Sequence, residues 1–356
     1  MKPLSPVLRS LLTLVVVVVL LAGYLLVRGL IAAGVFASAG QAHFAGRCVA
    51  VSGIVGAEDI AIDRPDHIAF LSAADRRRPS GRDGLYAMNL DGPAHLVRLS
   101  GTPADFHPGG ISLYRTPDGE VTLMAIDRHG DGRFGIDIFA VTVAGGAAKL
   151  AMRAAVTGGL LVHPNDIAAV SPNAFYVTND STVENPALRT LSDYALLRRA
   201  DVVYFNGMMF REVARGLNFA NGIQVSPDGS HVYVAATLGR TLYTYVREPF
   251  SGALTQVDSL SIASGLDNID IDGKGNLWVA GHPSLLAQNA YRDDPSKPSA
   301  SQIFKVTVDN GVPASAAPVY VDNGGQIGDA SVGAIIGKRL LIGSPLDDKI
   351  LDCHLN

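Results

Sequence analysis

Residues 226–248, SPDGSHVYVAATLGRTLYTYVRE, carry the pattern of a turn, a strand, a short turn and a second strand. Pro, Asp and Gly form turns, and the segments that follow are short and rich in the β-branched and aromatic residues that favour strands. The same pattern continues from about residue 49 onward. Further strand-length segments are HIAFLSA, GLYAMNL, VTLMAID, AFYVTND, NLWVAGH, QIFKVTV and RLLIGSP. The chain is therefore predicted to be all-β.

One segment departs from this pattern. Residues 186–199, PALRTLSDYALLRR, place apolar residues at a spacing of about 3.6, which is typical of an amphipathic helix. We expect a single helix inserted among the strands.

Composition limits both the size of the core and the kind of partner. The chain has 356 residues, of which 48% are hydrophobic and 17% are charged, so it can bury a large core. Its 38 Gly and 19 Pro indicate many turns. The net charge of -4 argues against a nucleic-acid partner. We interpret the one basic run, Arg76-Arg77-Arg78, as a solvated loop.

The N-terminal segment has the features of a signal anchor. Lys2 and Arg9 precede an apolar run at residues 11–27, about 17 residues long, which is near the lower limit for crossing a bilayer. Positive charge ahead of the run predicts a cytoplasmic N-terminus and an extracytoplasmic remainder. Ala37-Ser38-Ala39 supports the alternative of a cleaved signal and a secreted protein. We expect an anchor at residues 1–39 and a membrane-anchored domain at residues 40–356.

Two cysteines agree with an exported domain. Cys48 follows the anchor and Cys353 lies about 300 residues further along, so a bond between them would join the two ends of the domain. An oxidising compartment permits such a bond. Two unrelated buried thiols are the alternative.

Short clusters of acidic and amide residues recur along the domain at steps of about 45 to 55 residues. The clusters are Glu58-Asp59, Asn165-Asp166, Asn221-Gly222 and Asp267-Asn268, with the loop FHPGGIS at residues 106–112 between the first two. The step fits one four-stranded blade, and six such blades fill the domain. In a propeller the inner strands meet at a central tunnel, so these loops would converge there. Oxygen ligands without cysteine favour a hard cation such as Ca²⁺.

The ordered motifs resemble the serum paraoxonase/arylesterase family. The motifs are GAEDI (56–60), FHPGGIS (106–112), PNDI (164–167), YVTND (176–180), FANGI (219–223), DNI (267–269), LWV (277–279), GHP (281–283) and LLIG (340–343). The resemblance covers nearly the whole chain, including the hydrophobic N-terminus and the cysteine pair. It implies a six-bladed β-propeller that hydrolyses lactones and aryl esters with calcium.

The resemblance also implies two calcium sites in a central tunnel. A catalytic ion would be held by Glu58, Asn165, Asn221, Asp267 and Asn268. A structural ion deeper in the tunnel would take Asp59, Asp166 and the backbone carbonyl of Ile111. In each set two carboxylates neutralise one dication.

The chain departs from the family at the general base. The family is given a histidine dyad, and its two positions are Gly109 and Arg128 here. Three other histidines are candidates for the acid–base role: His107 lies near Gly109, His129 follows Arg128, and His282 matches a pocket histidine of the family. The carboxylates Asp180 and Asp267 are candidates for the base or the nucleophile.

The resemblance places Phe219 in the wall of the substrate pocket, and residues 181–209 at the helix that caps it. That segment is interpreted as a lid, a membrane-surface helix or simple packing.

The function predicted from these motifs is calcium-dependent hydrolysis of small esters or lactones. A related gluconolactonase-like or strictosidine-synthase-like propeller enzyme is an alternative. Because the dyad is missing, a non-catalytic calcium-stabilised binding propeller is another.

Overall fold

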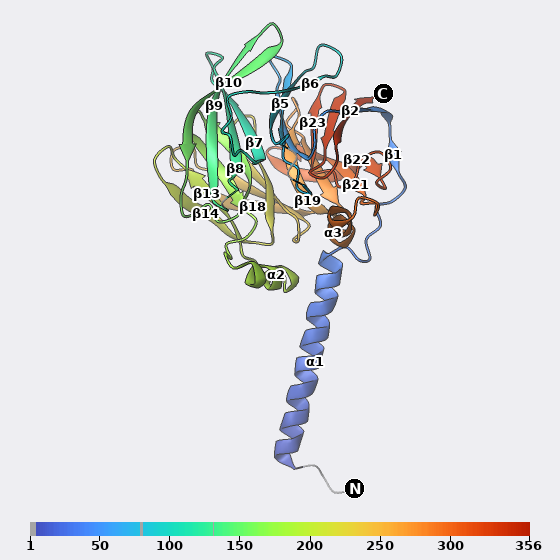
Figure 1. The fold of residues 1–356 in the computed structure, drawn as a ribbon. Coiled ribbons are helices and arrows are strands. Elements are labelled where there is room, and N and C mark those ends of the chain that lie inside the picture. Colours follow the sequence, from blue (N-terminus) through green and yellow to red (C-terminus); the bar gives the residue numbers. More distant parts are fainter. Residues whose placement is uncertain (1–4, 79–80, 131) are drawn as a thin grey trace.

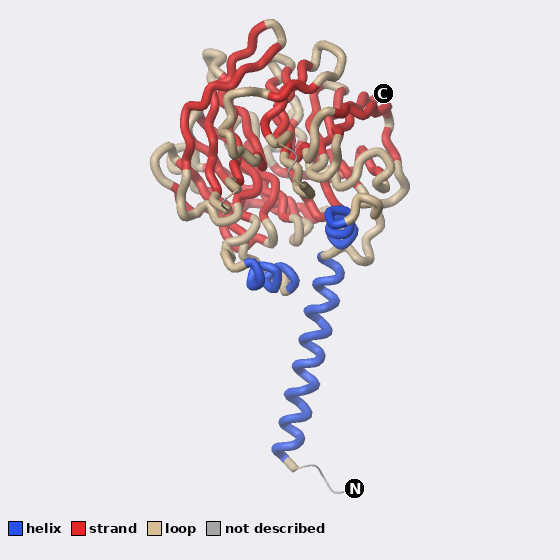
Figure 2. The backbone as a smooth tube through the Cα atoms, in the orientation of Figure 1, coloured by secondary structure: helices blue, strands red, loops and turns tan. Residues whose placement is uncertain are grey.

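The computed structural model describes residues 5–78, 81–130 and 132–356. Six antiparallel sheets are arranged around a central axis, and a long helix projects from one end of the assembly (Figure 1). The prediction of a six-bladed β-propeller is confirmed. Figure 2 shows that strands make up the body, whereas the helices lie together at one end of it.

Each blade runs from an inner strand beside the axis to an outer edge. The inner strands are β3 (Ala57–Asp63), β7 (Pro108–Arg115), β11 (Pro164–Ser171), β15 (Ala220–Val225), β19 (Gly265–Ile271) and β23 (Val332–Ile336). The second strands are β4 (Ile68–Ala73), β8 (Val121–Arg128), β12 (Ala174–Asn179), β16 (His231–Ala236), β20 (Leu277–His282) and β24 (Arg339–Gly343). The third strands are β5 (Gly84–Asn89), β9 (Phe134–Ala144), β13 (Ala200–Phe205), β17 (Thr241–Arg247), β21 (Ser301–Asp309) and β25 (Lys349–Leu355).

The outer strands complete the sheets. They are β6 (Leu96–Arg98), β10 (Ala147–Val156), β14 (Phe210–Leu217), β18 (Leu254–Ser261), β22 (Val312–Asp322) and β2 (Gly46–Ser52). The short strand β1 (His43–Phe44) adds to β22 as a fifth strand.

The ring is closed by strands from opposite ends of the domain. β2 pairs antiparallel with β25, and the register places Cys48 opposite Cys353. These two residues form a disulfide across a sequence separation of 305, which confirms the predicted pairing. The last blade therefore contains both ends of the domain.

The core lies between neighbouring blades. The cluster that joins the first and last blades, for example, includes Ile60 and Leu71 from one and Val332 and Leu341 from the other, all of them buried. Each such contact surface removes apolar side chains from water, which is the main force that holds adjacent sheets together.

Within the described residues three helices lie outside the strand pattern: α1 (Pro6–Ala32), α2 (Pro186–Tyr194) and α3 (Leu285–Asp293). The helix predicted at residues 186–199 begins where expected, with Asn185 as its cap, but it ends at Tyr194. It stops because Leu196 adopts a left-handed backbone with φ of 51°. The expectation of a single inserted helix is wrong, because α3 also follows the capping residue Ser284.

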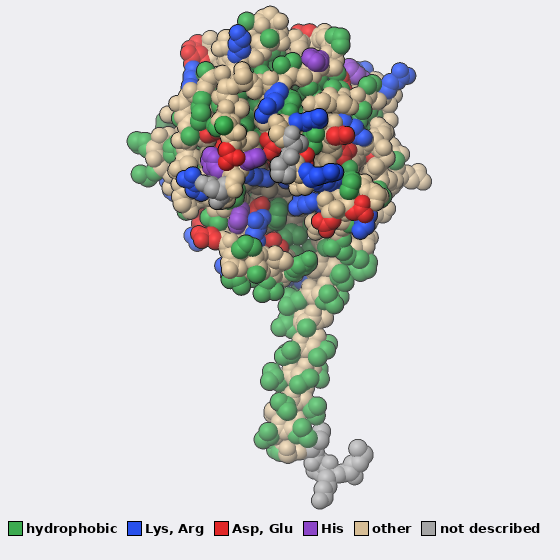
Figure 3. Space-filling model, in the orientation of Figure 1, with side chains coloured by type: hydrophobic (Ala, Val, Ile, Leu, Met, Phe, Trp, Pro, Cys, Tyr) green, Lys and Arg blue, Asp and Glu red, His purple; other side chains and the backbone are tan. Residues whose placement is uncertain are grey.

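Helix α1 extends beyond the predicted run. It has 27 residues and a mean hydropathy of 2.8, and its most apolar segment is fully exposed. Hydrophobic side chains cover it along its length (Figure 3). Its end is fixed to the propeller, since the Ala32 carbonyl accepts from Arg240 Nε at 3.1 Å and the Ala33 carbonyl accepts from Leu285 N at 2.9 Å.

Candidate active site

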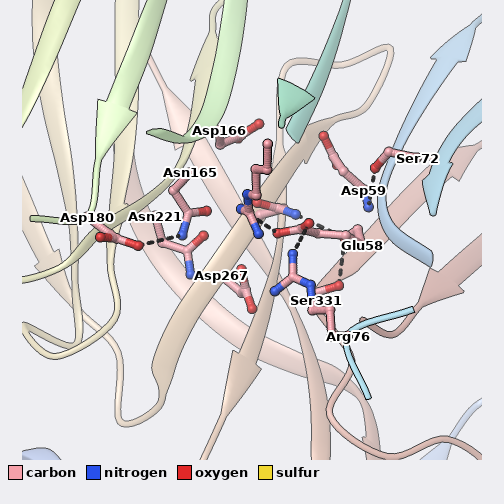
Figure 4. A network of polar contacts seen from close by, with 12 residues as sticks. Glu58, Asp59, Ser72, Arg76, Asn165, Asp166, Asp180, Asn221, Asp267 and Ser331 are labelled. Carbon is pink, nitrogen blue, oxygen red and sulfur yellow. Dashed lines mark hydrogen bonds and ion pairs between the residues drawn. The ribbon is translucent and has the colours of Figure 1, made fainter. Parts of the chain in front are cut away.

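Bulges at the start of the inner strands build the site. The pairing of β3 with β4 shifts between Ala57 and Asp59, so Glu58 has no partner across the ladder. Four other inner strands shift in the same way, at Gly109-Gly110, Asn165-Asp166, Asn221-Gly222 and Asp267-Asn268. A bulge releases residues from the ladder and re-aims their side chains. The side chains of Glu58, Asn165, Asn221 and Asp267 thus converge (Figure 4).

Two glycines allow the inner strands to approach one another at these bulges. A Cβ atom at Gly110 would lie 2.4 Å from Asp166 Oδ1, and one at Gly222 would lie 2.5 Å from the Asp267 carbonyl. Both contacts are far too short for any side chain. Glycine at these positions therefore permits the close packing that brings the clusters together.

A cavity of about 490 Å³ lies at this convergence. Seven of the predicted site residues line it: Glu58, Asn165, Asp180, Phe219, Asn221, Asp267 and His282. All three helices contribute to its lining as well, through Gly29 of α1, Tyr194 of α2 and Leu286 of α3 among others. The cavity therefore opens toward the helical end of the propeller.

Two asparagine side chains, Asn221 and Asn268, present oxygen atoms that have no partner in the described part of the protein. Asn221 Nδ2 donates to Thr237 Oγ1 at 3.1 Å, and Asn268 Nδ2 donates to the Glu58 carbonyl at 3.1 Å. The Oδ1 atoms of Asn221 and Asn268 are buried without a hydrogen-bond partner among the described residues. Asn165 Nδ2 likewise donates to Asp180 Oδ2 at 3.5 Å. Amide groups held in this way leave their oxygens for a cation, so the residues fit a metal ion.

Glu58 lies between two arginines. Its carboxylate forms ion pairs with Arg76 and with Arg128, the latter at 3.4 Å. Burial acts to raise the pKa of Glu58, but the charges of Arg128, Arg76 and Arg292 lower it overall. Glu58 is thus held as a carboxylate. The expectation of a solvated loop at residues 76–78 is wrong, because Arg76 lines the cavity and Arg77 donates to the Leu346 and Tyr291 carbonyls at 2.6 Å each.

Arg128 occupies the space of the missing side chain at position 109. A Cβ atom at Gly109 would lie 3.1 to 3.3 Å from the guanidinium atoms of Arg128. The two positions that the resemblance assigns to the dyad are therefore in contact. A glycine at one position makes room for a long cation from the other.

Asp267 is positioned by a buried histidine. His282 Nε2 lies 2.6 Å from Asp267 Oδ2, and His282 Nδ1 lies 2.9 Å from Asp329 Oδ1. Burial acts to lower the pKa of His282, but the carboxylates of Asp329 and Asp267 raise it to about 10. Both ring nitrogens face carboxylates, so His282 orients Asp267 and has no free lone pair in this arrangement.

A second pair of carboxylates lies on the axis. Asp59 accepts from the backbone N–H groups of Ile60 and Ile111 at 2.8 Å each, and Asp166 accepts from those of Ile167 and Ile223 at 2.8 Å each. Burial, opposed by these hydrogen bonds, raises the pKa of Asp59 to about 7. Burial and then the charge of Asp59 raise the pKa of Asp166 well above its ordinary value. Two buried carboxylates, one of which acts electrostatically on the other, fit the binding of a cation.

The structure separates two of the predicted histidines from the cavity. His107 Nδ1 contacts Asp83 Oδ2 at 2.6 Å, and His129 Nδ1 contacts Asp127 Oδ2 at 3.1 Å. Neither histidine lines the cavity. His107 thus pairs with a residue next to β5 of the first blade, and His129 with a residue on β8 of the second.

Several cavity residues were not predicted from the sequence. They are Arg76, His163, Arg189, Arg292 and Ser331. His163 Nε2 contacts the Val183 carbonyl at 3.1 Å, and burial lowers the pKa of its ring. Its place two residues before Asn165, at the start of an inner strand, is the one signal that pointed to it.

The fold and the cavity together define a six-bladed β-propeller with a polar site on its axis. Residues 55–355 match the model of the Arylesterase family, and the chain belongs to that family. Serum paraoxonase/arylesterase 2 of Rattus norvegicus is 33% identical over 321 residues, which are 86% of this chain and 88% of that protein. Serum paraoxonase/arylesterase 1 of Homo sapiens is 31% identical over 322 residues, again 86% and 88%.

The solved structures support the fold. XC5397 from Xanthomonas campestris, described as a gluconolactonase, aligns with a TM-score of 0.52 and 17% identity over 90% of this chain and 92% of that chain. The resemblance drawn from the ordered motifs is therefore confirmed at the level of family and architecture.

Proposed function

We propose that this protein is a calcium-dependent hydrolase of esters and lactones. The observation that carries the proposal is the set of oxygen atoms at the cavity, where the buried amide oxygen of Asn221, without a partner among the described residues, accompanies the carboxylates of Glu58 and Asp267. Such a set suits calcium and does not suit softer metals. Membership of the Arylesterase family supports the reaction class.

In this proposal one ion is held by Glu58, Asn165, Asn221, Asp267 and Asn268, and a second by Asp59, Asp166 and the Ile111 carbonyl. The first ion would act as a Lewis acid toward the carbonyl oxygen of the substrate. The protein's own contribution is to hold the ligands rigidly. His282 and Asp329 fix Asp267, while Thr237 fixes Asn221.

Asp180 is the proposed general base. It lines the cavity beside Asn165, and burial raises the pKa of its carboxyl although Arg189 and Arg128 oppose the shift. A raised pKa makes a carboxylate a better proton acceptor. Asp180 would take a proton from water as the water oxygen bonds to the carbonyl carbon, and return it to the departing alkoxide.

Helix α1 is the proposed membrane anchor. Because its end is hydrogen-bonded to the propeller beside the cavity, an anchored α1 would place the cavity near the membrane surface. Exposed apolar side chains on the neighbouring helices agree with this placement: Leu188, Leu191, Tyr194 and Leu286. We propose that α2 forms part of a lid at this surface.

The test is a panel of aryl esters and aliphatic lactones, assayed with EDTA and again after calcium is restored. Calcium-dependent turnover is expected, and stability that responds to calcium without any turnover would favour a binding propeller. Asn165→Ala should abolish turnover, whereas the matched control Asn173→Ala, in an exposed turn, should not. Asp180→Asn should lower kcat by about 10²–10⁴ while calcium still stabilises the protein. Full activity in Asn165→Ala would contradict the assignment of Asn165 as a ligand of a catalytic ion.

A further inference from the structure

We propose that the substrate of this site carries a carboxylate close to its scissile carbonyl, and that Arg76 and Arg128 bind that carboxylate. The inference rests on the proposed hydrolase function and names the chemical class of its substrate.

The first observation is that several arginines face one carboxylate. Arg76 and Arg128 both form ion pairs with Glu58, and the charge of Arg292 also acts on it. One arginine closed on one carboxylate is the contrasting arrangement. Arg339, for example, donates to both oxygens of Asp352 at 2.9 and 2.8 Å. A single carboxylate cannot accept all the hydrogen bonds that these guanidinium groups can donate, so N–H donors at the cavity are left over.

The second observation is the charge of the cavity lining as a whole. Among the described residues that line it, four arginines stand against four carboxylates: Arg76, Arg128, Arg189 and Arg292 against Glu58, Asp180, Asp193 and Asp267. His282 also lines the cavity and is a fifth cation, but its buried partner Asp329 balances it, so the charges cancel before any calcium is bound. A divalent cation then leaves two positive charges without a partner, in a site where water is partly excluded. An anionic ligand is the chemical complement of that excess.

The third observation is that the guanidinium groups retain unused donors. The hydrogen bonds of the Arg76 and Arg128 side chains within the described residues run to Glu58 alone, through one nitrogen of each. Their side chains remain 23% and 29% exposed, and both line the cavity. Arginine offers five donors in a planar fork that matches a carboxylate. Because residue 109 is a glycine, the guanidinium group of Arg128 has room beside it.

The position of these arginines fixes where the substrate charge must lie. Glu58 belongs both to the arginine cluster and to the proposed ligand set of the catalytic ion. The bound carboxylate and the reacting carbonyl must therefore be only a few bonds apart. A γ-lactone with a carboxylate on its ring meets this requirement, whereas a simple aryl acetate does not.

The test compares matched neutral and anionic compounds with the full-length, calcium-loaded protein in detergent. The substrates are a γ-lactone carboxylate and its primary carboxamide. The binding probes are pyroglutamate, whose lactam ring resists hydrolysis, and its carboxamide, measured by calorimetry. We expect at least about a tenfold preference for the anion, both in kcat/KM and in Kd, as one charge-assisted contact gives. Arg128→Gln and Arg76→Gln should each reduce that ratio toward one.

Arg215→Gln is the matched control, because it removes the same charge from an exposed side chain on β14 and should leave the ratio unchanged. Equal or weaker binding of pyroglutamate, together with turnover of neutral esters, would overturn this inference and leave the proposed function standing. Absence of turnover for every ester would overturn both. If the cavity variants do not fold, the preference of the unmodified protein for the anion over the carboxamide still tests the inference.

Discussion

Removing calcium above pH 7 should destabilise this propeller much more than removing it at pH 5, because of the buried pair Asp59 and Asp166. Burial raises the pKa of Asp59 from 3.8 to about 7, so the metal-free folded state binds a proton that the unfolded state releases. That stability is present below about pH 4 and is lost as pH rises through 7. A shift of about three pKa units corresponds to about 4 kcal/mol.

The loss is large compared with a net folding free energy of about 5–15 kcal/mol. It corresponds to a change in Tm of about 6 °C for a domain of this size. A cation between the two carboxylates would replace the proton. Calcium should therefore raise the Tm by an amount that grows between pH 5 and pH 8.

The measurement is the Tm as a function of pH, taken at intervals from pH 5 to pH 8, once in EDTA and once in calcium. Asp166→Asn removes one charge with little change in shape, so it should flatten the metal-free curve and weaken the response to calcium. Asp309→Asn, at an exposed strand end, is the control. A calcium-induced shift that does not depend on pH would refute the reasoning.

Three further predictions address other parts of the structure. Cys353→Ser should lower the unfolding free energy by about 2–5 kcal/mol, because the lost bond closes 305 residues; denaturant unfolding that matches the oxidised parent would contradict this. Gly109→Ala should displace the Arg128 guanidinium, 3.1 Å from the new Cβ, and reduce kcat/KM for an anionic lactone with little change in Tm. Asn221→Ala removes a buried, unpartnered oxygen and should weaken calcium binding at least about tenfold by calorimetry; unchanged affinity would exclude that ligand.

The blade repeat could be predicted from the sequence because it is local. Each strand segment has its own composition, and the polar clusters recur once per blade at the start of an inner strand. A cluster that interrupts an apolar strand marks the bulge, and the bulge aims the side chain at the axis. For this reason the sequence could predict that Glu58, Asn165, Asn221 and Asp267 lie together, as they do in the lining of the cavity.

The cation chemistry of the cavity could not be predicted in the same way. The basic run at residues 76–78 has no local feature that distinguishes a solvated loop from one whose first side chain reaches Glu58. The contact between His282 and Asp329 joins residues of different blades. The contact of Arg128 with Gly109 could not be predicted from the sequence, because it depends on the distance between neighbouring strands. Helix α3 could not be predicted because its nine residues make only about two and a half turns, too few for a helical period to stand out from the strands around it.

The pairing of β2 with β25 has a consequence for synthesis and export. The sixth blade has no complete sheet until β25 has been made, although its partner β2 was made about 300 residues earlier. Until β25 has been made, β2 has an unpaired edge, and unpaired strand edges promote aggregation. A chain that ends in the fifth blade lacks β25 and Cys353, so it can form neither the closing strand pair nor the disulfide.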